Sequence, residues 1–331
     1  MYEGKVILIT GGTGSWGNEL TEQLLKKNPK EIRILSRGEL AQVKMERKFN
    51  DKRLRFFIGD IRDMEAVKYA TKDVDYIFHL AALKHVPVCE EQPQEAIKTN
   101  IVGTATLINA AIANGVEKVV DVSTDKAVDP INLYGMTKAV GEKLIIQANK
   151  LMGNTKFMCI RAGNVLGSNG SVVPYFIDQI KTFNKVMITD ANMTRYFLTL
   201  PEAIQLLFKA AESSIGGETF VMKMPSCKIT DMATVLIEAY GNADTKMEFS
   251  GSRPGEKLDE VLVSRYESDH SYSYDENYFL ILPTLNIDGL NAYYEQGKKL
   301  QKVSFKEYTS RDTLLDEEQI RTMLIKGGFM I

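Results

Sequence analysis

The chain has 331 residues, 41 Lys plus Arg against 43 Asp plus Glu, a formal net charge of −2 and 44% hydrophobic residues. At about 100–200 residues per domain, this length allows two domains or one large elaborated domain. The ordinary apolar content excludes a mainly disordered chain, and the near-neutral charge gives no electrostatic argument for a nucleic-acid or membrane-surface partner.

Cysteine usage and the N-terminus narrow the class further. Cys89, Cys159 and Cys227 are scattered and not spaced as CxxC, which argues against a disulfide framework and a zinc site, so we expect no metal. We see no apolar run approaching the roughly 18–20 residues that span a bilayer. The start MYEGKVILITGG lacks the pattern of a signal peptide. We expect a soluble, cytoplasmic protein.

Short β-rich runs alternate with helical patterns over the first part of the chain. The expected strands are Val6–Thr10, Ile32–Leu35, Arg55–Ile58, Tyr76–Leu80, Lys118–Ser123 and Lys156–Arg161. Such alternation is typical of βαβ units with a parallel sheet covered on both faces. The pattern predicts an α/β fold with a Rossmann-type doubly wound parallel sheet in residues 1–165.

The rhythm changes after Arg161. Gly and Ser cluster in Gly163–Ser171, and helices are expected near Val173–Phe183 and Pro201–Ala211, with strands near Thr219–Met224 and Lys246–Phe249. Beyond about Val261 the chain is aromatic and polar and gives no clear pattern. We expect residues 166–331 to form a smaller, partly interleaved α+β substrate domain, with some later segments returning to the first domain.

A glycine turn follows the first strand. Positions 10–17 read TGGTGSWG, which places Gly11, Gly14 and Gly17 between a strand and a helical pattern. Gly11 allows a tight turn, Gly14 allows close approach of a pyrophosphate, and Gly17 allows the helix to pack on the sheet. A flexible turn is the simpler reading, but at the head of a βαβ series the triplet predicts a dinucleotide site.

The end of the second strand indicates which dinucleotide binds. An NAD site usually carries an acidic residue here, whereas this chain has Ser36 and Arg37 and no acidic residue before Glu39. A guanidinium suits a 2′-phosphate, so we predict NADP; the alternative is that Arg37 is a solvated loop charge. Asp60, after the third strand, is placed to accept from the adenine amino group or to cap the next helix.

Tyr134 and Lys138 stand four residues apart on an expected helix and share one face. An ammonium beside a phenol favours the phenolate, so we expect Lys138 to lower the pKa of Tyr134 toward neutrality and to make it a base for a sugar hydroxyl.

Thr124, Asp125 and Lys126 follow the fifth expected strand. They place a hydroxyl, a carboxyl and an amine at the carboxyl end of a strand, where open α/β sheets bind ligands. A carboxylic acid and an amine whose environments separate their pKa values can divide acid and base roles, as elimination of water requires. A plain surface ion pair is the alternative.

With these motifs, the sequence resembles the extended short-chain dehydrogenases/reductases, and among them the soluble, configuration-inverting UDP-N-acetylglucosamine 4,6-dehydratases. The resemblance runs through TGGTGSWG, FFIGDIRD, HLAALKHVP, KTNIVGT, STDKA, NLYGMTK, GNVLGSNGSVVP, MTRYFLTL and RPGEKLDE. The last three blocks are specific to nucleotide-sugar dehydratases, and the similarity weakens beyond about Val261.

The resemblance implies a redox-neutral reaction. Tyr134, assisted by Lys138 and Thr124, takes the proton of the C4 hydroxyl as the C4 hydride passes to NADP+. The 4-ketone acidifies the C5 proton, Lys126 removes it, Asp125 protonates the C6 hydroxyl, and water leaves. Hydride returns to C6 and C5 is reprotonated from the opposite face, which gives UDP-2-acetamido-2,6-dideoxy-β-L-arabino-hex-4-ulose.

The resemblance also implies binding residues. Ala81 and Ala82 form a thin wall for the cofactor, Lys84 and His85 border the sugar, and His85 is equally well read as a packed loop histidine; His79, inside a strand pattern, reads as core. The full cofactor set is Gly11, Thr13, Gly14, Ser15, Trp16, Gly17, Ser36, Arg37, Asp60, Ile61, Ala81, Ala82, Lys84, Tyr134 and Lys138. The substrate set is Lys84, His85, Asn164, Val172, Arg195, Arg253 and Glu256, and some of these arginines are expected to be structural ion-pair members. The family assembles as dimers or hexamers, so a homo-oligomer is expected.

Two positions depart from the family. Ala162 stands where an aromatic residue usually precedes the GNV block, and Gly38 stands where close relatives carry an acidic residue. Neither position belongs to the acid, base or hydride apparatus.

Three other readings compete. A configuration-retaining dehydratase tends to have Met where this chain has Tyr134, and many such enzymes carry an N-terminal membrane region. A UDP-hexose 4-epimerase keeps the Tyr134–Lys138 pair but does not need Asp125 and Lys126 for C5 and C6. A non-catalytic NADP-binding protein predicts loss of the substrate blocks, which are present.

Overall fold

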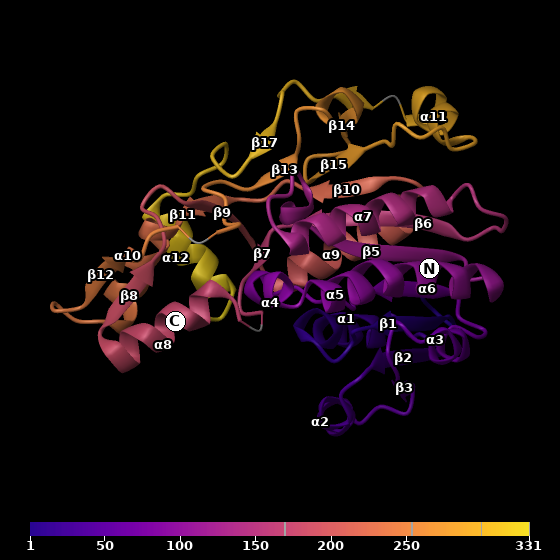
Figure 1. Cartoon of the computed structure of the whole chain (residues 1–331), viewed down its shortest axis with the longest axis horizontal. Helices are drawn as coiled ribbons and strands as arrows, with labels where there is room; N and C mark the ends of the chain where they lie inside the picture. Colours follow the sequence, from indigo (N-terminus) through magenta and orange to yellow (C-terminus); the bar gives the residue numbers. More distant parts are fainter. Residues whose placement is uncertain (169, 253, 299, 331) are drawn as a thin grey trace.

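The structure is a computed structural model that describes residues 1–168, 170–252, 254–298 and 300–330. Figure 1 shows a large body built on a twisted sheet and a smaller lobe at one end of it, made largely of α8, α10 and α12 with their short strands.

The large sheet is the frame of the molecule. Its strands are β1 (Val6–Thr10), β2 (Glu31–Ser36), β3 (Leu54–Ile58), β4 (Tyr76–His79), β5 (Lys118–Thr124), β6 (Lys156–Ala162), β10 (Thr219–Met222), β14 (Ser271–Ser273), β15 (Tyr278–Ile281) and β16 (Gln301–Lys302). Over the described residues the order is β16-β14-β15-β10-β6-β5-β4-β1-β2-β3, and the pairs from β3 to β10 are parallel. The run β3-β2-β1-β4-β5-β6 is the strand order of the doubly wound dinucleotide-binding fold. The predicted fold class and its first six strands are confirmed.

Helices cover both faces of this sheet. They are α1 (Ser15–Leu25), α2 (Glu39–Phe49), α3 (Met64–Ala70), α4 (Val86–Glu91), α5 (Pro93–Ile97), α6 (Gly103–Ala113), α7 (Leu133–Ala148) and α9 (Leu200–Ser213). On one face α1 packs against α9, and on the other α6 packs against α3 and α7. Side chains alternate accordingly along β1: Ile7 and Ile9 belong to the core under α1 and α9, and Leu8 to the core under α6 and α7.

The segment from Pro93 to Ala113 runs through α5, the π-helical turn Lys98–Val102 and α6 as one helix. By length and composition alone it could cross a membrane, contrary to the expectation that no run approaches that length. In the fold this helix lies against the sheet, and 56% of its most apolar 18-residue stretch is buried. One such helix is weak evidence for a membrane span, because core helices pass the same test.

The smaller lobe has its own apolar core. It contains β7 (Asn164–Val165), β8 (Lys185–Ile188), β9 (Thr194–Leu198), β11 (Ser226–Lys228) and β12 (Lys246–Phe249), with α8 (Val172–Phe183), α10 (Ile229–Tyr240) and α12 (Glu317–Lys326). Phe176, Ile180, Leu236 and Leu324 pack together between these helices.

The remaining elements lie outside these two sets. They are β13 (Val261–Val263), which pairs with β17 (Tyr308–Thr309), α11 (Leu290–Ala292), and the helical turns Asp125–Ala127, Ser268–His270 and Tyr293–Lys298. Beyond Val261, where no clear pattern was expected from the sequence, β14, β15 and β16 extend the large sheet in antiparallel fashion. The domain boundary at residue 165 stays a prediction.

Candidate active site

The turn between β1 and α1 is shaped by two glycines. Gly11 has φ +66°, and a Cβ there would lie 2.8 Å from the backbone of Ala81. At Gly17 a Cβ would lie 2.1 Å from the carbonyl oxygen of Gly12. Larger residues are therefore excluded at both positions, and α1 begins against the end of β1.

The N-terminus of α1 faces a cavity. Its N-cap, Gly14, offers no side-chain cap, and the first turn carries no acidic residue. Thr13, Gly14, Ser15 and Trp16 line a cavity of about 900 Å³. The N–H groups in the first turn of a helix and the positive end of its dipole suit a phosphate, so this end of the cavity fits the pyrophosphate of a dinucleotide.

The far end of the cavity is lined by Ser36, Arg37, Asp60 and Ile61. Asp60 forms an ion pair with Arg62 at 2.7 Å, and this hydrogen bond holds the pKa of the Asp60 carboxyl below its usual value. The alternative that Asp60 caps the next helix is wrong, because the N-cap of α3 is Asp63.

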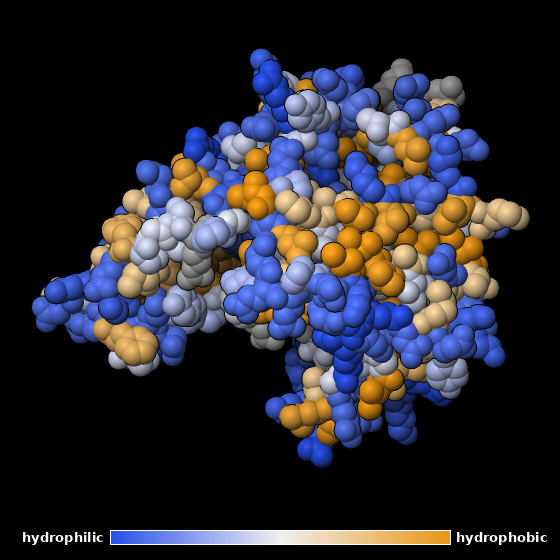
Figure 2. All heavy atoms as spheres, viewed as in Figure 1, coloured by the Kyte–Doolittle hydropathy of each residue, from blue (hydrophilic) through white to orange (hydrophobic). Residues whose placement is uncertain are grey.

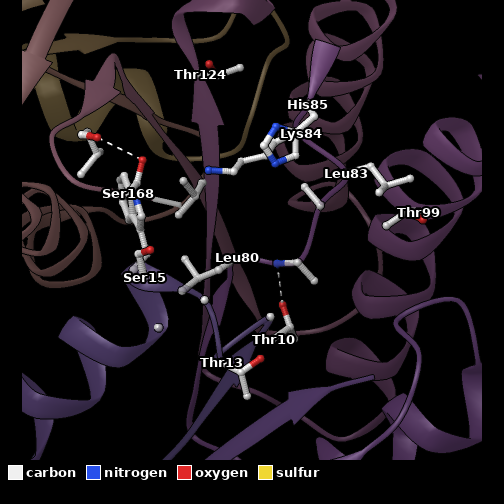
Figure 3. A pocket seen from close by; sticks show the side chains of 18 of the residues that line it. Thr10, Thr13, Ser15, Leu80, Leu83, Lys84, His85, Thr99, Thr124 and Ser168 are labelled. Atoms are coloured by element: carbon white, nitrogen blue, oxygen red, sulfur yellow. Dashed lines mark hydrogen bonds between the residues drawn. The ribbon is translucent and has the colours of Figure 1, made fainter. Parts of the chain in front are cut away.

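The loop after β4 forms another wall of the cavity. Ala81, Ala82, Lys84 and His85 line it, and Figure 3 shows the side chains of Lys84 and His85 reaching inward from this loop. Burial of the ammonium lowers the pKa of Lys84. His85 lies against Gly170, where a Cβ would be 2.9 Å from the imidazole Cε1, so the cavity is narrow here.

Thr124, Asp125 and Lys126 meet where β5 ends. The Thr124 hydroxyl donates to Asp125 Oδ1 at 2.8 Å, and Lys126 Nζ donates to the same oxygen at 3.1 Å. Asp125 is 1% exposed, and its Oδ2 has no hydrogen-bond partner among the described residues. Lys126 and Thr124 line the cavity, whereas Asp125 lies behind them. The pair is not a plain surface ion pair.

Tyr134 and Lys138 lie on α7 as predicted, and Tyr134 lines the cavity. The expected lowering of the phenol pKa is wrong for this structure. Burial raises the pKa of Tyr134, and the charges of Lys138 and Lys126 and the hydrogen bond with Thr124 offset this rise only in part.

Lys138 forms a buried ion pair with Asp121. Lys138 Nζ lies 3.2 Å from Asp121 Oδ2, and both side chains are buried. Burial disfavours the Lys138 ammonium, but the Asp121 carboxylate, with a further contribution from Tyr134, offsets that effect and raises the pKa of Lys138. The ammonium is thus held as an ion, and its charge is the largest of the effects that lower the pKa of Tyr134, although it does not offset burial.

His79 lies in the core beside this pair, as its place in the strand pattern indicates. Its Nδ1 is 2.7 Å from the Thr10 hydroxyl, its Nε2 is 3.2 Å from the Thr104 hydroxyl, and Asp121 Oδ1 is 4.0 Å away. Burial lowers the pKa of His79 to about 4, so the imidazole is neutral near pH 7.

A second cavity of about 830 Å³ meets the first one at Lys126, Asn164, Gly170 and Val172. Arg195 and Glu256 line it on the side of the smaller lobe. The predicted residue Arg253 lies outside the described residues. Asn164 Oδ1 is 3.5 Å from Lys126 Nζ, so the predicted cofactor and substrate residues converge on Lys126.

Arg195 is held mainly by the protein itself. Its guanidinium donates to the carbonyl oxygens of Thr194, Lys257 and Leu258 at 2.7–3.0 Å and pairs with Glu260 at 3.5 Å and Glu256 at 3.6 Å. These contacts fasten β9 to the segment before β13. Arg195 therefore has the structural role expected of some of the arginines, alongside its place in the cavity wall.

The described ranges contain no group of three or more His, Cys, Asp or Glu arranged to hold a metal ion. The site combines a cavity that suits a dinucleotide, a second cavity, and a cluster between them formed by Asp125, Lys126 and Tyr134.

The family comparison agrees with this arrangement. Residues 7–282 match a family described as polysaccharide biosynthesis protein. The chain belongs to this family.

The proteins that are similar to this chain carry several different names. The chain is 44% identical to a UDP-N-acetylglucosamine 4,6-dehydratase (inverting) of Campylobacter jejuni subsp. jejuni, over 91% of each chain. It is 40% identical to a UDP-glucose 4-epimerase of Rickettsia bellii, over 100% of this chain and 98% of that one. It is 42% identical to an uncharacterized membrane protein of Methanocaldococcus jannaschii, over 99% and 98%. The X-ray structure of Pen from Bacillus thuringiensis, 37% identical, superposes with a TM-score of 0.92 and full coverage of both chains. The resemblance to extended short-chain dehydrogenases/reductases of the inverting dehydratase type is confirmed.

Two residues of the site were missed from the sequence. Asp121 is an acidic residue inside the otherwise apolar run KVVDVS, and a buried charge of this kind requires a partner. Glu260, at the end of RPGEKLDE, reaches Lys126 with an Oε1–Nζ distance of 3.4 Å. No local signal indicates that contact, because it depends on how the two lobes are joined.

Proposed function

We propose that the protein is a UDP-N-acetylglucosamine 4,6-dehydratase that inverts C5, with UDP-2-acetamido-2,6-dideoxy-β-L-arabino-hex-4-ulose as its product. The observation that carries the proposal is the Asp125–Lys126 pair at the junction of the two cavities, 3.1 Å apart and beside Tyr134. Oxidation at C4 needs only the phenol and the dinucleotide, whereas elimination across C5 and C6 needs a further acid and base.

The residues divide the proton transfers. Tyr134 takes the proton of the C4 hydroxyl, and Thr124, Lys126 and Lys138 act to lower its pKa. The ketone at C4 acidifies the C5 proton, which Lys126 removes in its amine form. Asp125, buried next to it, protonates the departing C6 hydroxyl. When bound, a nicotinamide dinucleotide would accept the hydride of C4 and return it to C6. C5 then takes up a proton on the face opposite to the one that lost it, so the configuration inverts and no external reductant is consumed.

We propose NADP as the dinucleotide. Ser36 and Arg37 line the cavity at the end of β2, where an acidic residue would favour the free ribose hydroxyls of NAD. Glu39 lies in the first turn of α2 and is not part of the cavity wall. A guanidinium at this position supports a 2′-phosphate, and NAD is the alternative that cofactor titration decides.

We propose that UDP-N-acetylglucosamine fills the second cavity. Lys257 and Arg195 bring positive charge to its wall, and Asn164 and Val172 connect it to the reacting centre. These side chains support a diphosphate in the second cavity and the hexose next to Lys126.

An epimerase is the second candidate, because relatives named UDP-glucose 4-epimerase are 40% identical over nearly their whole length. Mass spectrometry of the product separates the two. Incubation with UDP-N-acetylglucosamine should yield a nucleotide sugar lighter by one water. A product of unchanged mass that co-elutes with the C4 epimer would establish the epimerase and remove the dehydratase. A retaining dehydratase gives the same mass and differs only in C5 configuration.

We also propose that the protein is a homo-oligomer. Figure 2 shows apolar side chains gathered over α5, α6 and α7, and Ile97, Val102, Met136 and Val140 are exposed there. A second copy of the chain would cover them. Light scattering of the wild type should give the mass of a dimer or hexamer, and Val140→Glu should give the mass of a monomer. A wild type that is monomeric and sediments with lipid vesicles would contradict both the proposed oligomer and the predicted cytoplasmic location.

A further inference from the structure

Lys126 lies between two carboxylates. Asp125 Oδ1 is 3.1 Å from Nζ on one side, and Glu260 Oε1 is 3.4 Å from it on the other. Glu260 comes from the segment before β13, far from Lys126 in the sequence, and lines the second cavity. The general base of the proposed elimination is therefore fixed at the junction by a residue of a different chain segment.

Glu260 itself is held rigidly. Its N–H donates to the Ser310 hydroxyl at 2.9 Å, and its carbonyl oxygen accepts from Ser310 N–H at 2.9 Å. It is 2% exposed, and within the described residues its Oε2 has no hydrogen-bond partner. Oε1 also faces Arg195 Nε at 3.5 Å. A buried carboxylate in this position needs positive partners, and Lys126 and Arg195 are those partners.

The other charged and titratable groups around Lys126 come from each element packed against it. Asp125 lies on the adjoining turn, Tyr134 on α7, Arg195 on β9, and Lys257 on the segment that carries Glu260. Burial and Arg195 disfavour the Lys126 ammonium, but Asp125 and Glu260 more than offset them and raise the pKa of Lys126. Two negative neighbours thus oppose the loss of the proton that the base must shed.

We propose that Glu260 is a positioning residue for Lys126: its carboxylate holds the lysine as an ammonium in the resting site and fixes Nζ between the two cavities. This deepens the proposed function and rests on it for the role of Lys126 as base. The consequence is that Glu260 sets the pH above which the amine form becomes available.

The decisive variant is Glu260→Gln, which keeps the size of the side chain and removes its charge. An opposite charge at this distance shifts a pKa by about 1–3 pH units. We measure the rate of hydrogen–deuterium exchange at C5 of UDP-N-acetylglucosamine as a function of pH. In the variant we expect the acidic limb of this pH–rate profile to move down by about 1–3 pH units. Asp259→Asn is the matched control, because Asp259 is the neighbouring residue but bonds to Thr194 and Arg311. The acidic limb of the pH–rate profile of Asp259→Asn should lie at the same pH as that of the wild type. If Glu260 had a merely structural role, Glu260→Gln would lower the exchange rate without moving the limb.

A substrate-free measurement separates this inference from the proposed function. In protein labelled with ¹³C-lysine, the Lys126 signal, assigned by its absence in Lys126→Arg, should titrate above the ordinary lysine value of about 10.4 in the wild type and lower in Glu260→Gln. A wild type that does not act on UDP-N-acetylglucosamine but shows this titration would overturn the function and keep the pairing. Equal Lys126 titrations, or an unmoved limb, would overturn the pairing. If Glu260→Gln does not fold, Glu260→Asp takes its place and should shift the acidic limb and the Lys126 titration by a smaller amount. A wild-type Lys126 that titrates at or below the ordinary lysine value overturns the proposal without any variant.

Discussion

The buried pair of Asp121 and Lys138 offers a quantitative test of the site's electrostatics. The two charged groups lie 3.2 Å apart, with side-chain exposures of 0% and 4%. At an effective dielectric constant of about 20, Coulomb attraction at this distance is about 5 kcal/mol. Removing one partner from such a pair typically costs about 3–5 kcal/mol, because the other charge is left buried without compensation.

Asp121→Ala and Lys138→Met should therefore each lower the free energy of unfolding by about 3–5 kcal/mol. With about 2.1 cal/mol/K of unfolding entropy per residue and 331 residues, this lowers Tm by about 4–7 °C, measured by circular dichroism at pH 7. The double variant should lose much less than the sum, because neither charge remains. Glu117→Gln is the control: its pair with Lys5 is 49% and 30% exposed, so it should cost no more than about 1 kcal/mol. Additive single effects, or an Asp121→Ala loss no larger than that of the control, would refute the reasoning.

Three further predictions follow from the site. Lys126→Ala should retain the fold and NADP binding but abolish C5 proton exchange, and full turnover by this variant would remove the assigned base. Arg37→Ala should raise KM for NADP far more than KM for NAD, and equal effects in a steady-state titration would remove the reason for choosing NADP. Burial lowers the pKa of His79 to about 4 in the folded protein, below the unfolded value of about 6.5. The contribution of its neutral imidazole to the free energy of unfolding is therefore complete above about pH 6.5 and is lost as the pH falls toward about 4. Between pH 7 and pH 5 the wild type should lose about 2 kcal/mol more stability in urea unfolding than His79→Gln, and parallel losses would count against a buried neutral imidazole.

The predictable part of the fold is the part governed by local pattern. Val6–Thr10 and Lys118–Thr124 are apolar, β-rich runs bounded by turn residues, so their strands and the parallel sheet followed from the sequence. The glycine turn and the Tyr134–Lys138 spacing placed the cofactor cavity and the helix that faces it.

The unpredicted part depends on contacts between distant segments. Glu260 lies beside Lys126 and Asp121 beside Lys138, and each carboxylate raises the pKa of the lysine that it contacts. The sequence marks Asp121 as a buried charge that needs a partner without indicating which residue supplies it, and it gives no local signal for Glu260. The pKa of Tyr134 was predicted in the wrong direction because the effect of Lys138 was considered without the burial of the phenol, which raises the pKa more than the charge of Lys138 lowers it. The strands beyond Val261 were missed because they are only two to four residues long, and two of them, Ser271–Ser273 and Gln301–Lys302, are mostly polar.

The most direct test of the central claim is proton NMR of UDP-N-acetylglucosamine incubated with the purified protein in D2O. We predict a 6-deoxy-4-ketose that carries deuterium at C5 and shows the couplings of the β-L-arabino configuration. The D-xylo couplings would place the protein with the retaining dehydratases. An unchanged spectrum with NADP present would contradict the proposed substrate and the roles assigned to Asp125 and Lys126.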